Sequence, residues 1–371
     1  MLRLRTPLAA IVIAAVPAFS DSIITTDAGP MAISRVADGL IEPWAIAFLP
    51  DGGFLITERG GVLKHFRRSM AAPAIIDGLP AIAVFGQGGL LDVMIPRDFA
   101  DTREIWFTYS VAKDPGAATA IGKGVLSPDG TRVSGFVTHF ELATGSDDPR
   151  HFGARLIEAA DGTIFATIGD RGTGPDGMAA QDLLRGEGKV IYLNRDGTPA
   201  IRLSGALPGV YSYGHRNPQG ATLDLTGRLL TVEHGAQGGD ELNAPEASKN
   251  YGWPVVSYGL DYDDARIGVG TQSPGIEQPL HYWDPSIAPS GLMIYSGALV
   301  PEWRGDIFFG SLNSDFLGRL DPDTPAPTGY SEERIAAPET SRVRDVVEAP
   351  DGSIWFLSVV QGAAYRIAPA P

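Results

Sequence analysis

The sequence predicts an all-β fold, a six-bladed β-propeller with four antiparallel strands in each blade. Three observations predict it: a hairpin pattern that recurs along the chain, a composition rich in turn residues, and the lack of an obvious linker between repeats. Glycine (46) and proline (29) are plentiful, while only 20% of the 371 residues are charged, which favours many turns between short strands. Stacking small sheets in a ring explains this periodicity, because it leaves only short, protected sheet edges.

Six hairpins are expected. Four share alternating apolar residues, a short turn with Asp-Gly or a close relative, and a second β-rich run: PWAIAFLPDGGFLITE from Pro43, GARLIEAADGTIFATIG from Gly153, PQGATLDLTGRLLTVE from Pro218 and RDVVEAPDGSIWFLS from Arg344. Asp-Gly supplies the positive φ angles that tight hairpins need. Two weaker copies lack that turn: GGLLDVMIPRDFADTREIWFTYS from Gly88 and SGLMIYSGALVPEWRGDIFFGSL from Ser290. The copies recur about 45 to 70 residues apart, and a pair of β-sandwiches is the alternative fold.

The first twenty residues have the layout of a secretory signal peptide. Arg3 and Arg5 precede an apolar stretch from Pro7 to Ala18, and a small residue, Ser20, marks the expected cleavage site. The apolar stretch is shorter than a typical membrane span, and an uncleaved membrane tether is the alternative. We therefore expect a periplasmic or secreted protein without stable membrane insertion, in which residues 21–371 form a single propeller domain.

Charge and cysteine content narrow the partners and the source of stability. The formal net charge is −15, with 44 acidic against 29 basic residues, so the surface repels phosphate backbones and nucleic acid is excluded as a partner. The chain has no cysteine. An exported protein without disulfides must be stabilised by its core, and a chain of this length can bury a large one.

In a propeller, the loops that enter the innermost strands gather around one mouth of the central channel. Polar residues stand just before four of the predicted inner runs: Gln87 before GGLLDV, His151 before GARLIEA, Arg216 and Asn217 before PQGATLD, and Arg342 and Arg344 before DVVEAPDG. The repeat therefore predicts that these residues, distant in sequence, lie together at one mouth.

The predicted cluster combines one titrating side chain with several permanent cations. His151 alone in this group titrates near neutrality, so it is the natural general acid or base, although a histidine that caps a strand is the simpler alternative. Three arginines at one mouth of an acidic protein repel one another unless an anion compensates them. Planar carboxylates match the guanidinium fork, so the predicted ligand is a polyanion.

The segment EHGAQGGDELNAPEASKNYGWP, Glu233 to Pro254, favours a calcium site. It places Glu233, Asp240, Glu241 and Asn243 among glycines, and calcium takes six to eight oxygens from carboxylates, carbonyls and water. A solvated acidic loop is the alternative. The histidines lack the paired spacing of a zinc site, and no Rossmann, Walker or nucleophile-elbow motif is present.

The motifs GQGGLLDV, HFGARL, IGDRG, YSYGHRNPQG, EHGAQGGDELN, KNYGWP and RVRDV stand in order along the chain. With them the chain, from about Gly39 to Ala368, resembles the PQQ-dependent aldose sugar dehydrogenases of the glucose/sorbosone dehydrogenase family. That resemblance implies a six-bladed propeller with pyrroloquinoline quinone (PQQ), a tricarboxylate, in a cleft at its top. It also implies an oxidoreductase that converts aldose sugars at C1 to lactones and passes the electrons to an acceptor that the sequence does not identify.

The resemblance also assigns roles to single residues. His151 would take the proton from the anomeric hydroxyl as hydride passes to the quinone, and Arg216 would polarise the quinone oxygen. The other cofactor contacts implied are Gln87, Asn217, Tyr262, Arg342 and Arg344, together with Asn313 in GSLNSD, where the family usually has lysine. The absent lysine removes one partner for a cofactor carboxylate.

Two calcium ions are implied by the same resemblance. One is held at the cofactor by main-chain carbonyls of a Gly-Pro pair, which corresponds to Gly235 and Ala236 here, so the rigid proline is missing. The other, structural ion falls on Glu241 and Tyr251.

Two other functions remain open, together with the oligomeric state, monomer or homodimer. A calcium-dependent propeller lactonase would use the acidic segment and His151 without a redox cofactor. A non-catalytic carbohydrate-binding propeller would use Tyr262, Trp253 and Trp283 as a stacking platform. The preferred sugar is not predicted, because loops that contact substrate vary freely.

Overall fold

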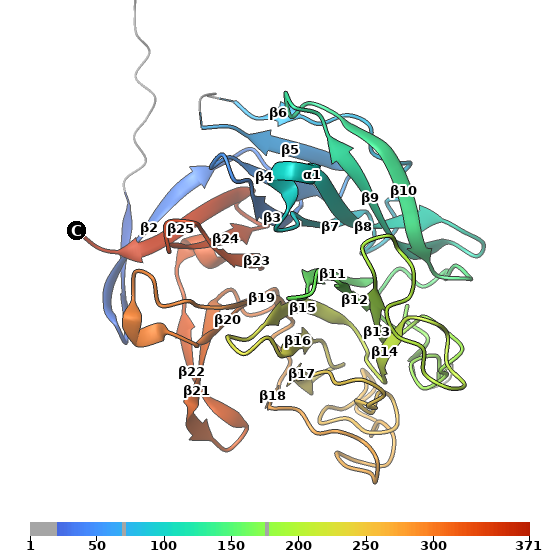
Figure 1. Ribbon diagram of the computed structural model, residues 1–371. Coiled ribbons are helices and arrows are strands. Elements are labelled where there is room, and N and C mark those ends of the chain that lie inside the picture. The colour runs from blue at the N-terminus through green and yellow to red at the C-terminus, as the bar shows by residue number, and fades with distance from the viewer. Residues whose placement is uncertain (1–20, 69–71, 175–177) are drawn as a thin grey trace, which may run out of the picture.

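The computed structural model, which describes residues 21–68, 72–174 and 178–371, is the predicted six-bladed propeller (Figure 1). Blade 1 consists of β3 (Pro43–Phe48), β4 (Phe54–Glu58), β5 (Val62–Phe66) and β6 (Ala74–Ile75). Blade 2 consists of β7 (Leu90–Met94), β8 (Glu104–Ala112), β9 (Ala117–Leu126) and β10 (Val133–Glu141). Blade 3 consists of β11 (Gly153–Glu158), β12 (Ile164–Ile168), β13 (Lys189–Leu193) and β14 (Val210–Tyr213). Blades 4 and 5 are β15 (Pro218–Leu223), β16 (Leu229–Glu233), β17 (Asp240–Asn243) and β18 (His281–Trp283); and β19 (Pro289–Ile294), β20 (Ile307–Ser311), β21 (Leu317–Ala326) and β22 (Gly329–Ile335). The first strand of each blade lines the central channel.

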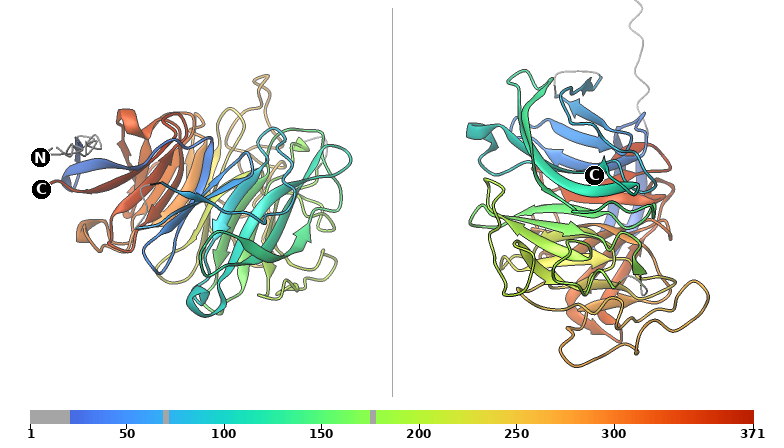
Figure 2. Two further views of the ribbon diagram at one scale, coloured as in Figure 1. Left: turned by 90° about the horizontal axis from the view of Figure 1, so that it is seen from above. Right: turned by 90° about the vertical axis from the view of Figure 1, so that its right-hand side faces the viewer.

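Blade 6 closes the ring by joining the two ends of the described chain. Its three inner strands are C-terminal: β23 (Val343–Glu348), β24 (Ile354–Ser358) and β25 (Ala363–Pro369). The N-terminal strand β2 (Gly29–Ala37) pairs antiparallel with β25, and β1 (Ser22–Thr26) adds a fifth strand outside it. The blue and red strands at one edge of the molecule show this closure (Figure 2). Backbone hydrogen bonds between the chain ends therefore hold the ring shut.

The hydrophobic core lies between the blades. Six clusters of buried side chains each fill the space between two neighbouring sheets, such as Leu55 of blade 1 against Phe107 of blade 2, and Phe308 of blade 5 against Phe356 of blade 6. This arrangement explains why the inner and second strands have apolar residues on both faces, since each sheet is covered by a neighbour on either side.

Buried threonines on the second strands tie three blades to their neighbours. Thr57 accepts a hydrogen bond from the Ala45 amide of its own blade and donates to the Leu91 carbonyl of the next blade, at 3.0 and 2.6 Å. Thr108 and Thr167 repeat the pattern in blades 2 and 3. Each threonine stands opposite a β-bulge in the inner strand. The bulge interrupts the regular strand pairing, so an inner-strand amide is left free to donate to the threonine hydroxyl.

The predicted hairpins are all present, and the structure corrects how Asp-Gly makes the turn. Only the glycine has a positive φ, for example +81° at Gly52 and +85° at Gly162. The aspartate instead accepts a hydrogen bond from the amide two residues later, as Asp51 does from Gly53. Thr226 and Gly227 make the same turn with Asp224 as the acceptor.

Helical structure is limited, within the described residues, to α1 (Phe99–Thr102) and the 3₁₀ turns η1 (Pro301–Trp303) and η2 (Pro338–Thr340). In that part of the chain no helix has the length and apolarity needed to span a bilayer. The predicted signal peptide, residues 1–20, lies outside the described residues, so that assignment stays a prediction.

Candidate active site

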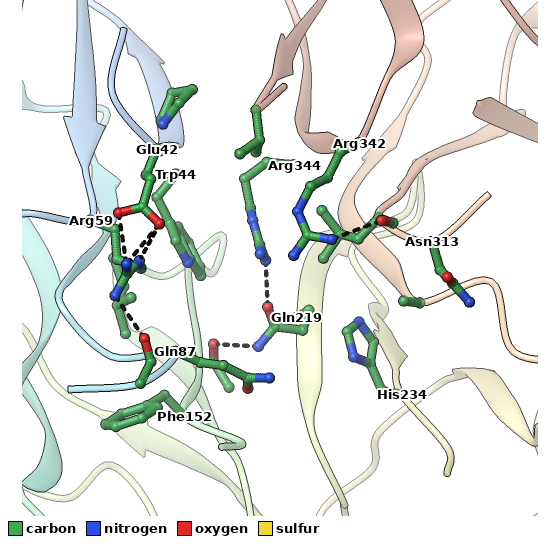
Figure 3. A pocket seen from close by; sticks show the side chains of 17 residues that line it. Glu42, Trp44, Arg59, Gln87, Phe152, Gln219, His234, Asn313, Arg342 and Arg344 are labelled. Atoms are coloured by element: carbon green, nitrogen blue, oxygen red, sulfur yellow. Dashed lines mark hydrogen bonds and ion pairs between the residues drawn. The ribbon is translucent and has the colours of Figure 1, made fainter. Parts of the chain in front are cut away.

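The mouth of the channel at the start of the inner strands holds a deep chamber, here called the main chamber (Figure 3). It has a volume of about 420 Å³. Two sets of loops build it. Segments that lead into inner strands supply Glu42, Gln87, Phe152 and Arg342, and turns between the second and third strands supply Arg59, His234, Asn313 and Val359. The predicted convergence of strand-entering loops is therefore correct, and the second set of turns completes the wall.

A side chamber of about 320 Å³ shares Gln87, His234, Ala288 and Asn313 with the main chamber, so the two form one cleft. His151, Arg216, Gly235, Ala236 and Tyr262 line this side chamber with Arg150. Tyr262 comes from the long connection between β17 and β18, and its side chain is 61% exposed. The side chamber is thus the open, outer part of the cleft.

Two arginines that line the main chamber have no carboxylate to neutralise them. Arg344 donates to the amide oxygen of Gln219 at 2.7 Å, and Arg342 donates to the Leu312 carbonyl at 3.0 Å (Figure 3). Neither guanidinium makes an ion pair with any described residue. Burial, and then the neighbouring Arg342 and Arg155, lower the pKa of Arg344 to about 9. A polyanion in the chamber would relieve this repulsion.

His151 lines the side chamber in a fixed orientation. Its ring is buried, and its Nδ1 lies 2.7 Å from the Asp170 carboxylate. Asp170 accepts a second hydrogen bond, also 2.7 Å, from the Trp253 indole. The His151 amide donates to the side-chain oxygen of Gln87 at 2.9 Å, which joins two of the predicted residues.

These contacts set the protonation state of His151. A carboxylate can only accept, so Nδ1 carries the proton and Nε2, which bonds to no described residue, has a free lone pair. Burial and then the nearby Arg216 lower the pKa of His151, although the Asp170 hydrogen bond opposes them. Burial would raise the pKa of Asp170, but the contacts with His151 and Arg216 outweigh it and lower that pKa. The pair is therefore a neutral imidazole on an ionised carboxylate, an arrangement that can accept a proton at Nε2.

Arg216 also lines the side chamber. Its guanidinium lies 5.0 Å over the Trp253 ring, donates to the carbonyls of His234 and Gly235, and approaches the Tyr262 hydroxyl at 3.4 Å. Its Nε is buried and has no hydrogen-bond partner in the described structure. A buried donor without a partner costs about 1 to 3 kcal/mol, so this one points to a ligand acceptor.

His234, between the two chambers, is a second neutral histidine. Its Nε2 lies 2.8 Å from the Pro289 carbonyl, so Nε2 carries the proton, and Nδ1 lies 3.4 Å from the side-chain amide of Asn217. Burial, followed by the charge of Arg344, lowers the pKa of His234 to about 3. It therefore contributes hydrogen bonding without adding a charge.

The carbonyls predicted to hold the cofactor-side calcium are only partly suited to it. Gly235 and Ala236 line the side chamber as expected, but the Gly235 carbonyl accepts a hydrogen bond from Arg216, a cation. The nearby Asp240 carboxylate is occupied by the Gly235, Ile287 and Ala288 amides and by Ser286. The described donor set is thus incomplete for calcium, and no chemical step is assigned to an ion there.

The second predicted site fits a hard cation better. Glu241 is part-buried beside Glu233, and burial together with that neighbouring carboxylate raises the pKa of Glu241 to about 8. The buried side-chain oxygen of Asn243 has no hydrogen-bond partner in the described structure. Tyr251 stacks on His215 at 4.9 Å and its hydroxyl bonds to the Ala244 carbonyl, so only its main-chain carbonyl is free for a cation. Excess negative charge and unbonded oxygens are what calcium neutralises.

All twelve predicted site residues therefore lie in or against one cleft or in the adjacent acidic pocket, which Arg216 and Gly235 connect to it. Asn217 lies behind the wall, where it accepts from the Gly153 amide and from Gln219. The predicted stacking platform of Tyr262, Trp253 and Trp283 is wrong in part. Trp283 is 3% exposed and packs in a core cluster, and Trp253 is 8% exposed, so only Tyr262 has an exposed ring.

Sequence reasoning missed several cleft residues: Trp44, Arg59, Asp170, Gln219 and His234. Arg59 and His234 directly follow the second strands of their blades, and Asp170 stands one residue further along in its blade. The shared position of Arg59 and His234 was available in the sequence. Trp44 and Gln219 lie inside inner strands, where only the three-dimensional register shows that they face the channel.

The comparisons with known proteins agree with this geometry. The family model described as Glucose / Sorbosone dehydrogenase matches residues 40–366. An aldose sugar dehydrogenase of Escherichia coli, YliI, is 39% identical, with 88% of this chain and 89% of that protein aligned. Quinoprotein glucose dehydrogenase B of Acinetobacter calcoaceticus is 25% identical over 94% and 91% of the two chains. The apo-form crystal structure of the soluble E. coli aldose sugar dehydrogenase superposes with a TM-score of 0.85 at 36% identity, covering 92% of this chain and all of that one.

Proposed function

The chain belongs to the glucose/sorbosone dehydrogenase family of oxidoreductases, and we propose that it oxidises aldose sugars at C1 to lactones with PQQ as its bound cofactor. The observation that carries the proposal is the pairing, in one cleft, of uncompensated arginines with a neutral, oriented histidine. The arginines suit a carboxylated cofactor and the histidine suits proton removal. The names of the quinoprotein and aldose-dehydrogenase relatives support the same function.

The cofactor would lie in the main chamber, held by the residues with free donors. Arg344 and Arg342 present guanidinium groups to carboxylates, and Gln87 and Asn313 present amide groups at the rim. Arg59 also lines the chamber, but Glu42 already pairs with its guanidinium at 2.6 Å. Trp44 also lines the chamber, where its ring lies against the Arg344 guanidinium. When bound, PQQ supplies the two-electron acceptor for the hydride of the sugar C1–H bond.

The chain supplies the proton transfer and the electrostatic stabilisation. His151 Nε2 accepts the proton of the anomeric hydroxyl while the C1–H bond breaks, and a C1=O bond forms in the lactone. Asp170 keeps the proton on Nδ1 and stabilises the imidazolium that results. Arg216, with its unpartnered Nε, stabilises negative charge that develops on oxygen in the cleft. A positioned base typically contributes about 10²- to 10⁴-fold in rate.

The sugar would occupy the side chamber, between His151 and Tyr262. Arg150 stands at its rim, where both oxygens of the Asp148 carboxylate hold the guanidinium at 3.0 and 2.7 Å. This pair is neutral overall, so the rim suits uncharged sugars. Within the proposal we also include export to the periplasm or medium, a structural calcium at Glu241 and electron transfer to an external acceptor.

The decisive experiment is reconstitution. The apo-protein is mixed with PQQ and Ca²⁺, and dye reduction is followed on addition of a panel of aldoses. The proposal expects reduction that requires both PQQ and sugar, with lactone as product. No reduction by any aldose would overturn it, and lactone hydrolysis by PQQ-free protein would identify the chain as a lactonase instead.

A further inference from the structure

One buried arginine next to His151 has no part in the chemistry described above. Arg171 follows Asp170 in the turn between β12 and β13, and its side chain is 1% exposed. Its guanidinium donates to the main-chain carbonyls of Asp148, Arg150 and Ala117, with the Asp148 and Ala117 contacts at 3.2 and 3.3 Å. Two of these three carbonyls belong to the segment 148–151 that ends in His151.

The surroundings of Arg171 are unusual for a buried cation. It makes no ion pair with any described residue, and burial lowers the pKa of Arg171 to about 10. Its Cζ lies 3.4 Å from the centre of the Phe152 ring. Arg319 in blade 5 shows the common arrangement, since ion pairs to Asp27, Asp306 and Glu333 surround it. Burying a guanidinium that contacts only carbonyls and an aromatic face costs folding free energy. Such a residue needs a reason to be there, and the segment that Arg171 holds in place supplies one.

That segment is strained. His151 has φ +57°, in the left-handed region that β-carbon-bearing residues rarely occupy, and Arg171 itself has φ +56°. Such conformations cost on the order of 1 to 3 kcal/mol each and persist only where surrounding contacts fix them. Here the main chain is held from both sides: the Arg171 amide donates to the His151 carbonyl at 3.2 Å, and the His151 amide donates to Gln87.

We propose that Arg171 is a positioning residue that clamps segment 148–151 through its carbonyls, so that His151 faces the cleft with Nδ1 on Asp170. The two neighbouring residues would have separate roles, because Asp170 orients the imidazole ring and Arg171 fixes the backbone from which the ring projects. The consequence for turnover rests on the proposed sugar oxidation, whereas the consequence for the backbone does not.

Lysine cannot replace this clamp. Three carbonyls from three different chain positions lie around the planar guanidinium, which directs its donors outward in fixed directions. An ammonium group keeps the charge but offers its donors from one point. Arg171→Lys therefore separates the geometric role from the electrostatic one, and Arg171→Ala leaves a space that free guanidinium can enter.

The test compares Arg171→Lys and Arg171→Ala with Arg319→Lys, a matched change of a buried arginine far from the cleft. The first readout, in apo-protein, is amide hydrogen exchange measured over residues 147–153. We expect at least tenfold faster exchange there in both Arg171 variants and no change there in Arg319→Lys.

The second readout is turnover of the PQQ-loaded protein. In both Arg171 variants we expect kcat to be about 10- to 100-fold lower, with sugar KM and PQQ binding nearly unchanged, because displacing a catalytic group by about 1 Å costs that much. Millimolar guanidinium should restore part of the kcat of Arg171→Ala only.

Unchanged exchange in segment 147–153, or wild-type kcat in Arg171→Lys, would overturn the proposal. So would failure of both Arg171 variants to fold, because Arg171 would then be a general structural residue. If the wild-type protein oxidises no sugar but the Arg171 variants still loosen segment 147–153, the proposed function fails and the clamp stands.

Discussion

Two neighbouring layers of side chains in the central channel each contain an arginine, but carboxylates neutralise only one of the two. In the lower layer, Arg155 lies between two buried carboxylates, with its Nη1 at 3.1 Å from Asp92 and 3.0 Å from Asp345. One residue nearer the mouth along β23, Arg344 faces the main chamber without a carboxylate partner. The two arginines share neighbours, since each guanidinium lies over the Trp44 ring and each donates to Gln219.

The difference shows which layer is built for a ligand. The charge of Arg155 is compensated within the protein, and its carboxylates also bond to backbone amides: Asp92 to Leu156 and Asp345 to Ile46. With the contact between Arg155 and Gln219, that layer joins inner strands of five blades. The upper layer keeps its positive charge for an anion that the chain does not supply. Changes in the upper layer should reduce function and spare stability, and changes in the lower layer should do the reverse.

The largest expected effect is on turnover, from the upper layer. His151→Gln removes the base, so kcat should fall about 10²- to 10⁴-fold while thermal stability and PQQ binding stay near wild type. In the wild type, only neutral His151 can accept a proton, and its pKa is lowered from 6.5. The kcat/KM should therefore decline on the acid side with a midpoint below pH 6.5 and reach a plateau at higher pH. If kcat/KM did not decline at low pH, or if His151→Gln kept a near-normal rate, His151 would not be the base.

The next largest effect is on stability, from the lower layer. Arg155→Met leaves Asp92 and Asp345 buried without a cation, which should cost about 3 to 5 kcal/mol in the free energy of unfolding. Burial already raises the pKa of Asp92 to about 6, so protonation will soften the loss in acid. Denaturant unfolding at pH 5 and pH 8 should show the larger loss at pH 8. An equal loss at both pH values would mean that the ion pairs are not its cause.

A smaller effect concerns the acidic pocket beside the cleft. The pKa of Glu241 is raised from 4.5 to about 8. Between these two pH values the native state therefore binds more protons than the unfolded chain. The stability of the metal-free protein should fall as pH rises from 4.5 to about 8. In EGTA, the Tm should drop by a few degrees from pH 5 to pH 8, and calcium should restore it most at pH 8. Glu241→Gln is the control, in which both the calcium effect and this part of the pH dependence should vanish.

The smallest expected change is a gain. Asn313 stands exposed at the rim, shared by both chambers, where its amide donates to the Ser286 carbonyl at 3.3 Å. Asn313→Lys would add a cation that faces bound cofactor, and an exposed ion pair contributes about 0.2 to 1 kcal/mol. Titration should show PQQ affinity raised by about two- to fivefold, with a gain that shrinks in salt. Weaker binding would mean that Asn313 does not face a carboxylate.

The contrast between the layers also marks what the sequence could predict. The repeat predicted the blades, and from them the meeting of Gln87, His151, Arg216 and Arg342 at one mouth, because a propeller brings equivalent loops together. The pairing of Arg155 with Asp92 and Asp345 could not be predicted. The three residues lie within inner strands, and which side chains meet across a channel depends on strand register and bulges. Arg171 was equally hidden, since its partners are backbone carbonyls, which no sequence pattern marks.

Uncompensated arginines at the mouth are the proposed binding site of an anionic cofactor. Titration of apo-protein with PQQ in the presence of calcium, compared between wild type, Arg344→Met and Arg155→Met, tests this role without relying on turnover. We expect one PQQ to bind per wild-type chain. The affinity should be about 10- to 100-fold lower in Arg344→Met, because a charge-assisted hydrogen bond is lost. Folded Arg155→Met should show a much smaller change in affinity. Equal PQQ affinity in wild type and Arg344→Met, or no binding to wild type, would show that these arginines do not hold the cofactor.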